Sequence, residues 1–174
     1  MKILKQVYPD KNIIFNITGF AVNMETPQKN IPLLLMKVRE LMMSNFRPIL
    51  NEWNLTEQQW RILRALYESH VLEPRELCDM CCILSPSMAG ILKRMEELEF
   101  IIKVPSKTDK RRVLVKLAPG IEVMVKKILD ANMQAYDEFA SKIDKQLIES
   151  LEKNLVSVLQ RNAHLEKEQA TTKA

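Results

Sequence analysis

The sequence predicts a protein of the mainly helical α+β class with a few short strands, and three observations lead to this prediction. The chain has 174 residues but only 3 glycines, and it is rich in the helix formers Leu, Glu, Lys and Met. Its hydrophobic content of 47% is sufficient for a buried core. Two alternating, β-branched runs, FIIKVP and RVLVKL, are typical of short strands. This length suits one domain, or one domain with a helical extension.

The first 30 residues are expected to be an N-terminal extension or arm. Their most apolar stretch, NIIFNITGFAV, is interrupted by Asn and Thr and lacks a small-residue cleavage site. No apolar run reaches the roughly 20 residues that a membrane-spanning helix needs. We therefore expect no signal peptide, no membrane partner and a cytoplasmic location.

The first long helix is predicted to begin after Pro32, with the sequence LLLMKVRELMMSNFRPILNEW. Its apolar positions almost encircle it, which is more than one core requires, so we expect a second partner to cover it. Pro48 lies inside the pattern and is expected to kink the helix. It also leaves the carbonyl of Ser44 without its usual donor.

The next helix carries a complete set of start signals within LTEQQW. Thr56 is predicted as the N-cap, and Gln59 completes a capping box. Leu55 is placed to staple onto Trp60 across the first turn. A helix from Glu57 to about Ser69 follows.

A short helix and a second capped helix come next, joined by a tight turn. Residues 70–73 form a connection, and Pro74 opens a brief helix that ends near Cys82. SPSMAGILKRMEELEF then begins with Ser85 as the predicted N-cap and Pro86 at the first helical position. This arrangement predicts a helix-turn-helix.

The second helix of this pair has two distinct faces. The apolar face is predicted to contain Met88, Ile91, Leu92, Met95 and Leu98, and the opposite face Ser87, Gly90, Arg94 and Glu97. A glycine inside a helix costs about 1 kcal/mol relative to alanine, so close approach by another surface would explain Gly90.

A basic loop joins the two predicted strands. The formal net charge is +4, and the segment 103–116 concentrates it. This segment holds Lys103, Lys107, Lys110, Arg111, Arg112 and Lys116, against the single acid Asp109. A basic hairpin directly after a helix-turn-helix predicts a winged helix-turn-helix at residues 55–120.

Such a domain is suited to double-stranded DNA. Arg94 would enter the major groove, and Arg111 or Arg112 the minor groove, with Asp109 orienting the guanidinium of Arg111. A solvated basic loop is the alternative interpretation. The candidate DNA-binding residues are Ser85, Ser87, Met88, Gly90, Lys93, Arg94, Lys107, Asp109, Lys110, Arg111 and Arg112.

Two long helices are predicted at the C-terminal end, over residues 121–162. The second is expected to be capped by Asp144. The charged segment 163–174 is expected to be a frayed, flexible tail.

Two motifs resemble those of the MarR family of bacterial transcription regulators. DKRRVLVKL looks like the family's Asp-x-Arg wing, and LSPSMAGILKRMEELEFI resembles its recognition helix and the following strand. The resemblance extends from about Ile31 to Arg161. MSNFRPILNEWNLTEQQWRIL is similar to the subgroup that controls aromatic-acid catabolism, including homoprotocatechuate and hydroxycinnamate regulators. In one departure, LAPGI stands where the family commonly has Leu-Thr-x-x-Gly.

This resemblance implies a homodimer on a pseudo-palindromic operator, in which residues 31–54 and 121–162 of both subunits interlock as a dimerisation region. It also implies an effector pocket between these helices and the winged domain. Arg47 is our candidate clamp for a carboxylate, Ser44 a candidate partner for a phenolic hydroxyl, and Trp60 a candidate wall. The alternatives are a surface ion pair for Arg47 and a core position for Trp60.

The cysteines Cys78, Cys81 and Cys82 lie too close together, and are too few, for a secreted disulfide framework. We expect small core residues on one helix face rather than a metal site, and we expect no cofactor. A thiol-based redox switch is an alternative role for them.

The sequence contains no recognisable catalytic constellation, so we expect no enzyme. The predicted function is a transcription regulator, expected to repress an aromatic-compound catabolic operon. A phenolic or hydroxycinnamic acid, or its thioester, would release it from the operator. Two competing hypotheses are an RNA-binding module and a helical interaction protein that does not bind DNA.

Overall fold

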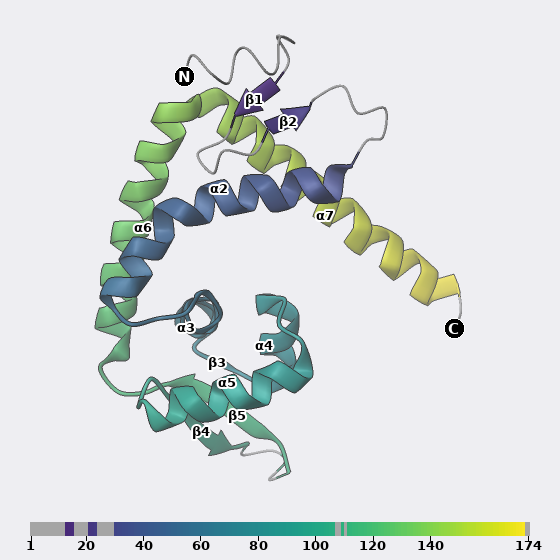
Figure 1. Cartoon of the computed structure of the whole chain (residues 1–174). Coiled ribbons are helices and arrows are strands. Elements are labelled where there is room, and N and C mark those ends of the chain that lie inside the picture. The colour runs from purple at the N-terminus through teal and green to yellow at the C-terminus, as the bar shows by residue number, and fades with distance from the viewer. Residues whose placement is uncertain (1–12, 16–20, 24–29, 107–108, 110, 173–174) are drawn as a thin grey trace. The chain divides into compact units, whose positions relative to one another are not determined.

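The structure is a computed structural model that describes residues 13–15, 21–23, 30–106, 109 and 111–172 (Figure 1). The chain divides into two compact units, Met1–Glu40 and Leu41–Ala174. In the first unit, strands β1 (Ile13–Phe15) and β2 (Ala21–Asn23) pair as an antiparallel two-stranded sheet. The prediction of an N-terminal arm did not include these strands, because three-residue strands are too short to produce a clear alternation.

Helix α2 (Ile31–Glu52) begins in the first unit and ends in the second. Asn30 caps it, since its side-chain oxygen accepts a hydrogen bond from the backbone N–H of Leu33 at 3.1 Å. Pro48 lies inside the helix, as the sequence predicts.

Helix α3 (Glu57–Ser69) starts where the capping signals predict. Thr56 Oγ1 accepts a hydrogen bond from the N–H of Gln59 at 3.2 Å, and Gln59 Oε1 accepts one from the N–H of Thr56 at 2.9 Å. The predicted capping box is confirmed. Leu55 and Trp60, the predicted staple pair, are both buried in the same core.

The helix-turn-helix consists of α4 (Pro74–Cys81) and α5 (Ser85–Glu97). The prediction of Ser85 as N-cap is wrong, because Leu84 holds that position. The carbonyl of Leu84 accepts hydrogen bonds from the N–H groups of Ser87 and Met88, at 2.9 and 3.1 Å. Those amides are the ones a capping serine would bind, so the Ser85 hydroxyl lies instead 3.6 Å from Cys78 Sγ.

A three-stranded antiparallel sheet with the order β3-β5-β4 follows the helices. Strands β4 (Ile101–Pro105) and β5 (Val113–Leu117) form the predicted hairpin, and α5 packs beside β4 (Figure 1). Strand β3 (Val71–Leu72) lies where only a connection was predicted. It pairs Val71 with Lys116 and Leu72 with Val115.

One core joins the winged domain to both flanking helices. It contains residues from α2 to α6, among them Leu50, Ile62, Leu66, Leu77, Met88, Leu92, Met95, Ile101, Val115, Val125 and Ile128. Leu98 was predicted to belong to the apolar face of α5, but it is 48% exposed. It is the C-cap of α5, where the regular helical spacing ends.

The last two helices are α6 (Ile121–Ile143) and α7 (Lys145–Thr172). Gly120 precedes α6 with φ +85°, a conformation that favours glycine. Asp144 Oδ1 accepts a hydrogen bond from the N–H of Leu147 at 3.0 Å, as the predicted cap requires. Helix α7 continues to Thr172 and so includes most of the segment predicted as a tail. Within the described residues, no helix has both the length and the apolar character to cross a membrane.

Candidate DNA-binding surface

Helix α5 buries one side and exposes the other. Met88, Leu92 and Met95 are buried in the core, whereas Ser87 and Arg94 are exposed. Met88 is only 2% exposed, so its side chain cannot reach a ligand outside the domain, and its prediction as a DNA-binding residue is wrong. The helical period that places Met88 on the apolar face is the physical reason.

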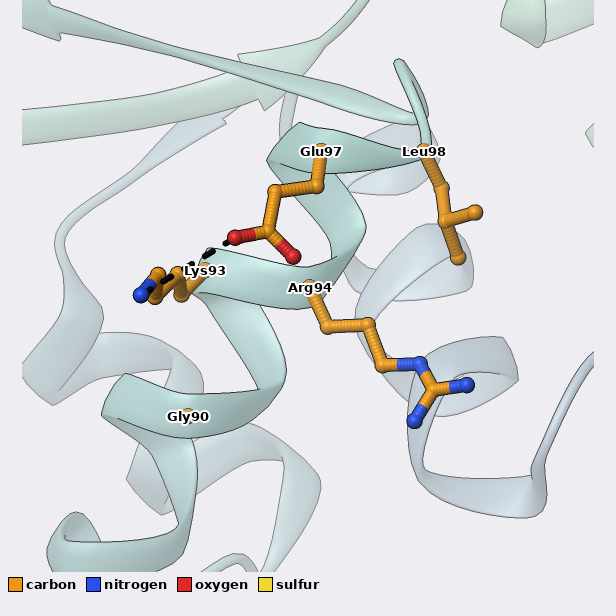
Figure 2. Close-up of a pocket in the computed structure, with 5 residues that line it drawn as sticks. All are labelled: Gly90, Lys93, Arg94, Glu97 and Leu98. Carbon is orange, nitrogen blue, oxygen red and sulfur yellow. Dashed lines mark ion pairs between the residues drawn. The ribbon is translucent and has the colours of Figure 1, made fainter.

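The exposed side of α5 carries a shallow, open depression, which Figure 2 shows in close-up. It is lined by Gly90, Lys93, Arg94, Glu97 and Leu98. Lys93 Nζ lies 3.9 Å from Glu97 Oε1, and the guanidinium of Arg94 extends away from this pair. Arg94 makes no ion pair within the described part of the chain. Its charge is therefore open to a partner.

Gly90 lies at one end of this depression, one helical turn before Lys93 and Arg94 (Figure 2). A Cβ atom added there would meet nothing within 4 Å. The fold therefore does not require glycine at this position, although glycine lowers helix stability. The absence of a side chain instead leaves room for close approach by another molecule.

The wing supplies further positive charge beside α5. Lys107 and Lys110 lie outside the described residues, whereas Asp109, Arg111 and Arg112 are exposed. Asp109 Oδ1 accepts a hydrogen bond from the backbone N–H of Arg111 at 2.9 Å. The prediction that Asp109 orients the guanidinium of Arg111 is therefore wrong. A short carboxylate reaches the backbone two residues on, so Asp109 shapes the turn that presents Arg111.

The two consecutive wing arginines have different surroundings. Arg111 makes no side-chain hydrogen bond or ion pair within the described residues. Arg112 forms an ion pair with Glu73, which directly precedes α4. The Asp-x-Arg pattern singles out Arg111 by sequence, whereas the pairing of Arg112 with Glu73 has no local sequence signal.

Arg75 is a candidate that sequence reasoning missed. It is exposed in the first turn of α4 and has no ion-pair partner among the described residues. A cation at a helix N-terminus opposes the helix dipole, so this position does not stabilise α4. In helix-turn-helix proteins the first helix crosses the phosphate backbone, where such a charge binds well. A basic residue directly after the helix-starting Pro74 was the available signal.

The candidate effector residues Arg47 and Ser44 lie on α2. Arg47 Nε is 2.8 Å from Glu57 Oε1, and both side chains are partly exposed. The ion pair weighed as an alternative for Arg47 is therefore present. The Ser44 hydroxyl donates to the carbonyl of Leu41 at 2.7 Å.

Trp60 is 8% exposed and belongs to the domain core. The core alternative for this residue is therefore confirmed, and its role as a wall of an effector pocket stays a prediction.

The three cysteines lie at the end of α4: Cys78 and Cys81 belong to the helix, and Cys82 is its C-cap. Cys81 is buried, and burial raises the pKa of its thiol despite the nearby Arg61. Cys78 packs partly against the core, but Cys82 is exposed and has φ +49°. The prediction that all three are core residues is therefore wrong for Cys82, which ends the helix in a left-handed conformation. Across the described residues, no group of three His, Cys, Asp or Glu side chains is arranged to hold a metal ion.

Comparison with known proteins supports a single family. The MarR family profile matches residues 55–113. The HTH-type transcriptional regulator FarR of Neisseria gonorrhoeae is 38% identical over 113 residues, which cover 65% of this chain and 77% of FarR. The homoprotocatechuate degradative operon repressor of Escherichia coli is 35% identical over 122 residues, covering 70% of this chain and 82% of the repressor.

A similar solved structure is that of NadR in complex with 4-hydroxyphenylacetate. It has a TM-score of 0.66 and 33% sequence identity, and the match covers 79% of this chain and 97% of NadR. The similarity therefore includes nearly the whole length of NadR.

Proposed function

Because the chain belongs to the MarR family, we propose that it is a ligand-responsive, DNA-binding transcription regulator that acts as a repressor in the cytoplasm. The observation that carries the proposal is the exposed side of α5, where Gly90 leaves space and Arg94 has a free charge. A helix of this kind fits the major groove, which is about 12 Å wide.

DNA contacts are assigned by exposure and charge. Ser87, Gly90, Lys93 and Arg94 of α5 face the major groove. Arg111 approaches the minor groove, whose negative potential attracts arginine. Lys107 and Lys110 are assigned to DNA by their charge alone. Ser85 and Arg75 lie near the phosphate backbone, and Asp109 holds the wing turn in shape.

A homodimer presents two such surfaces. Large apolar side chains remain exposed on the helices outside the winged domain, and burying them against a second copy removes them from water. They include Leu33, Leu34, Leu35 and Met36 on α2 and Leu147, Leu155, Val156, Val158, Leu159 and Leu165 on α7. Two reading heads about 34 Å apart match successive major grooves of a pseudo-palindromic operator.

The proposed effector is a small aromatic carboxylate, such as a phenolic acid. Two relatives support this class: one is named for a homoprotocatechuate operon, and NadR is solved with 4-hydroxyphenylacetate. The guanidinium of Arg47 would bind the carboxylate in competition with Glu57, and Ser44 would accept or donate a hydrogen bond at the phenol. The regulated genes would then belong to aromatic-compound catabolism.

DNA binding is tested by fluorescence anisotropy with a duplex promoter fragment over a series of KCl concentrations. The logarithm of the association constant falls as the logarithm of the salt concentration rises. Each lost phosphate contact makes this fall less steep, by about 0.9 in the slope. We expect that decrease for Arg94→Ala and for Arg111→Ala. Arg64→Ala is the matched control, because Arg64 is exposed but paired with Glu68 on α3. Failure of the wild-type protein to bind the duplex at low ionic strength would refute the proposed function.

Effector binding is tested by calorimetry with 4-hydroxyphenylacetate. Arg47→Ala should weaken binding, since the carboxylate loses its charged donor, while the control Arg64→Ala should not. If Arg47→Ala binds the acid as tightly as the wild type, Arg47 is not part of the site.

The second candidate function is thiol-based sensing, which one observation favours. Cys82 is exposed at the turn that joins the two helices of the helix-turn-helix. If peroxide abolished DNA binding in the wild type but not in Cys82→Ser, the thiol rather than the phenolic acid would be the signal.

A further inference from the structure

Glu73 and Arg112 connect two parts of the proposed DNA-binding surface. Glu73 immediately precedes α4, and Arg112 lies at the base of the wing, next to the start of β5. Their side chains form an ion pair in which the Glu73 side chain is 24% exposed and the Arg112 side chain 56% exposed.

The sheet explains why these residues meet. Leu72 of β3 is paired with Val115 of β5 in antiparallel register. Continuing this register by one residue places Glu73 opposite Leu114 and diagonal to Arg112. Diagonal neighbours lie within reach of long side chains, so the short strand β3 brings the acid to the wing.

Both partners are held by their own backbone environment. The Glu73 side chain accepts the N–H of Glu76, and the Glu73 N–H donates to Glu76 Oε2 at 2.7 Å, which closes a capping box at the start of α4. The Arg112 carbonyl accepts the N–H of Ser106, and the Arg112 N–H donates to the carbonyl of Asp109, each at 2.9 Å. The ion pair therefore joins two residues whose own backbone groups are hydrogen-bonded.

We propose that Arg112 is a positioning residue that Glu73 holds, and that it is not a phosphate contact. In this assignment, which rests on the proposed function, the Glu73–Arg112 pair fixes the angle of the wing relative to α4. Arg111 alone of the two arginines then enters the DNA. An arginine whose charge is already neutralised by a carboxylate releases no counterions from DNA, so the two arginines differ in their effect on salt dependence.

The experiment compares Arg112→Gln, Glu73→Gln and the double variant with Arg111→Gln, by anisotropy over a KCl series. Glutamine at position 73 can still accept the capping hydrogen bond, so helix α4 is preserved. Arg112→Gln and Glu73→Gln should each lower affinity by about two- to five-fold, as expected for a partly exposed ion pair. Arg112→Gln should leave the salt slope unchanged, because it removes no phosphate contact. The double variant should lose no more than either single variant, because all three lack the same pair. Arg111→Gln should lower the slope by about 0.9.

The opposite pattern overturns the inference. If Arg112→Gln lowers the salt slope, or if Glu73→Gln binds DNA more tightly than the wild type, Arg112 contacts phosphate and Glu73 merely competes with it. In that case the wild type and Arg111→Gln still behave as the proposed function requires. If the wild-type protein does not bind the duplex at all, the proposed function and this inference are both overturned.

Discussion

Replacing Gly90 by alanine should raise the stability of the protein and weaken its DNA binding. Gly90 is exposed in the interior of α5, and the added Cβ meets no atom within 4 Å. The substitution therefore gains the full helix-propensity difference, about 1 kcal/mol in the free energy of unfolding. For a chain of this size that corresponds to a melting temperature about 2–4 °C higher, measured by calorimetry at fixed protein concentration because a dimer's stability depends on it.

The same methyl group should obstruct the major groove. Inserting a methyl into a closely packed contact costs about 1–3 kcal/mol, which corresponds to roughly a 5- to 150-fold loss of affinity in anisotropy. Ala89→Gly on the same helix is the control: it should lower the melting temperature by a similar amount, and it adds no bulk. Wild-type affinity in a stabilised Gly90→Ala protein would remove this face of α5 from the interface. A lower melting temperature for Gly90→Ala would refute the reasoning about open space.

Three further outcomes follow from the packing. Thr56→Ala removes the side-chain acceptor for the Gln59 N–H, so urea denaturation should show a loss of about 1 kcal/mol, while Thr56→Ser should retain most of it. Met88→Ala should lower the free energy of unfolding by about 2–5 kcal/mol, and Met88→Leu should lower it by less than about 1.5 kcal/mol. Unchanged stability in Met88→Ala would contradict the buried position of Met88. Iodoacetamide at pH 8 should label Cys82 first and Cys81 last by mass spectrometry. Burial hides the Cys81 thiol and raises its pKa, so the rate of Cys81 labelling should increase as the pH rises. Equal labelling rates for Cys81 and Cys82 would contradict the burial of Cys81.

The features that sequence reasoning predicted correctly depend on neighbouring residues. The Thr56–Gln59 capping box, the helix start at Pro74 and the β4–β5 hairpin are each encoded within a few positions. The apolar side of α5 follows from helical periodicity in the same way. Local signals of this kind need no tertiary contact to be recognised, and together they were sufficient for the fold class.

The errors occur where a distant or competing partner decides the geometry. Strand β3 has two residues and exists because β5 pairs with it, so no periodicity could reveal it. Ser85 has the right chemistry for a cap, but the Leu84 carbonyl already binds the amides it would need. Asp109 was predicted to bind the guanidinium of Arg111, but its partner is the nearby backbone N–H of Arg111. The pairing of Arg112 with Glu73 likewise requires the sheet to be formed.

The Arg47–Glu57 ion pair offers a physical route from the proposed effector to the DNA-binding surface. Arg47 belongs to α2, whereas Glu57 lies in the first turn of α3. The buried side of α3 shares one core with α5, so a shift of α3 must be accommodated by the helix that carries Arg94. A ligand carboxylate that binds the Arg47 guanidinium in place of Glu57 removes an ion pair between α2 and α3. A conformer in which this ion pair is already broken therefore binds the ligand more tightly. The ligand then favours this conformer by the difference between its two affinities, which sets the upper limit on how strongly it can weaken operator binding.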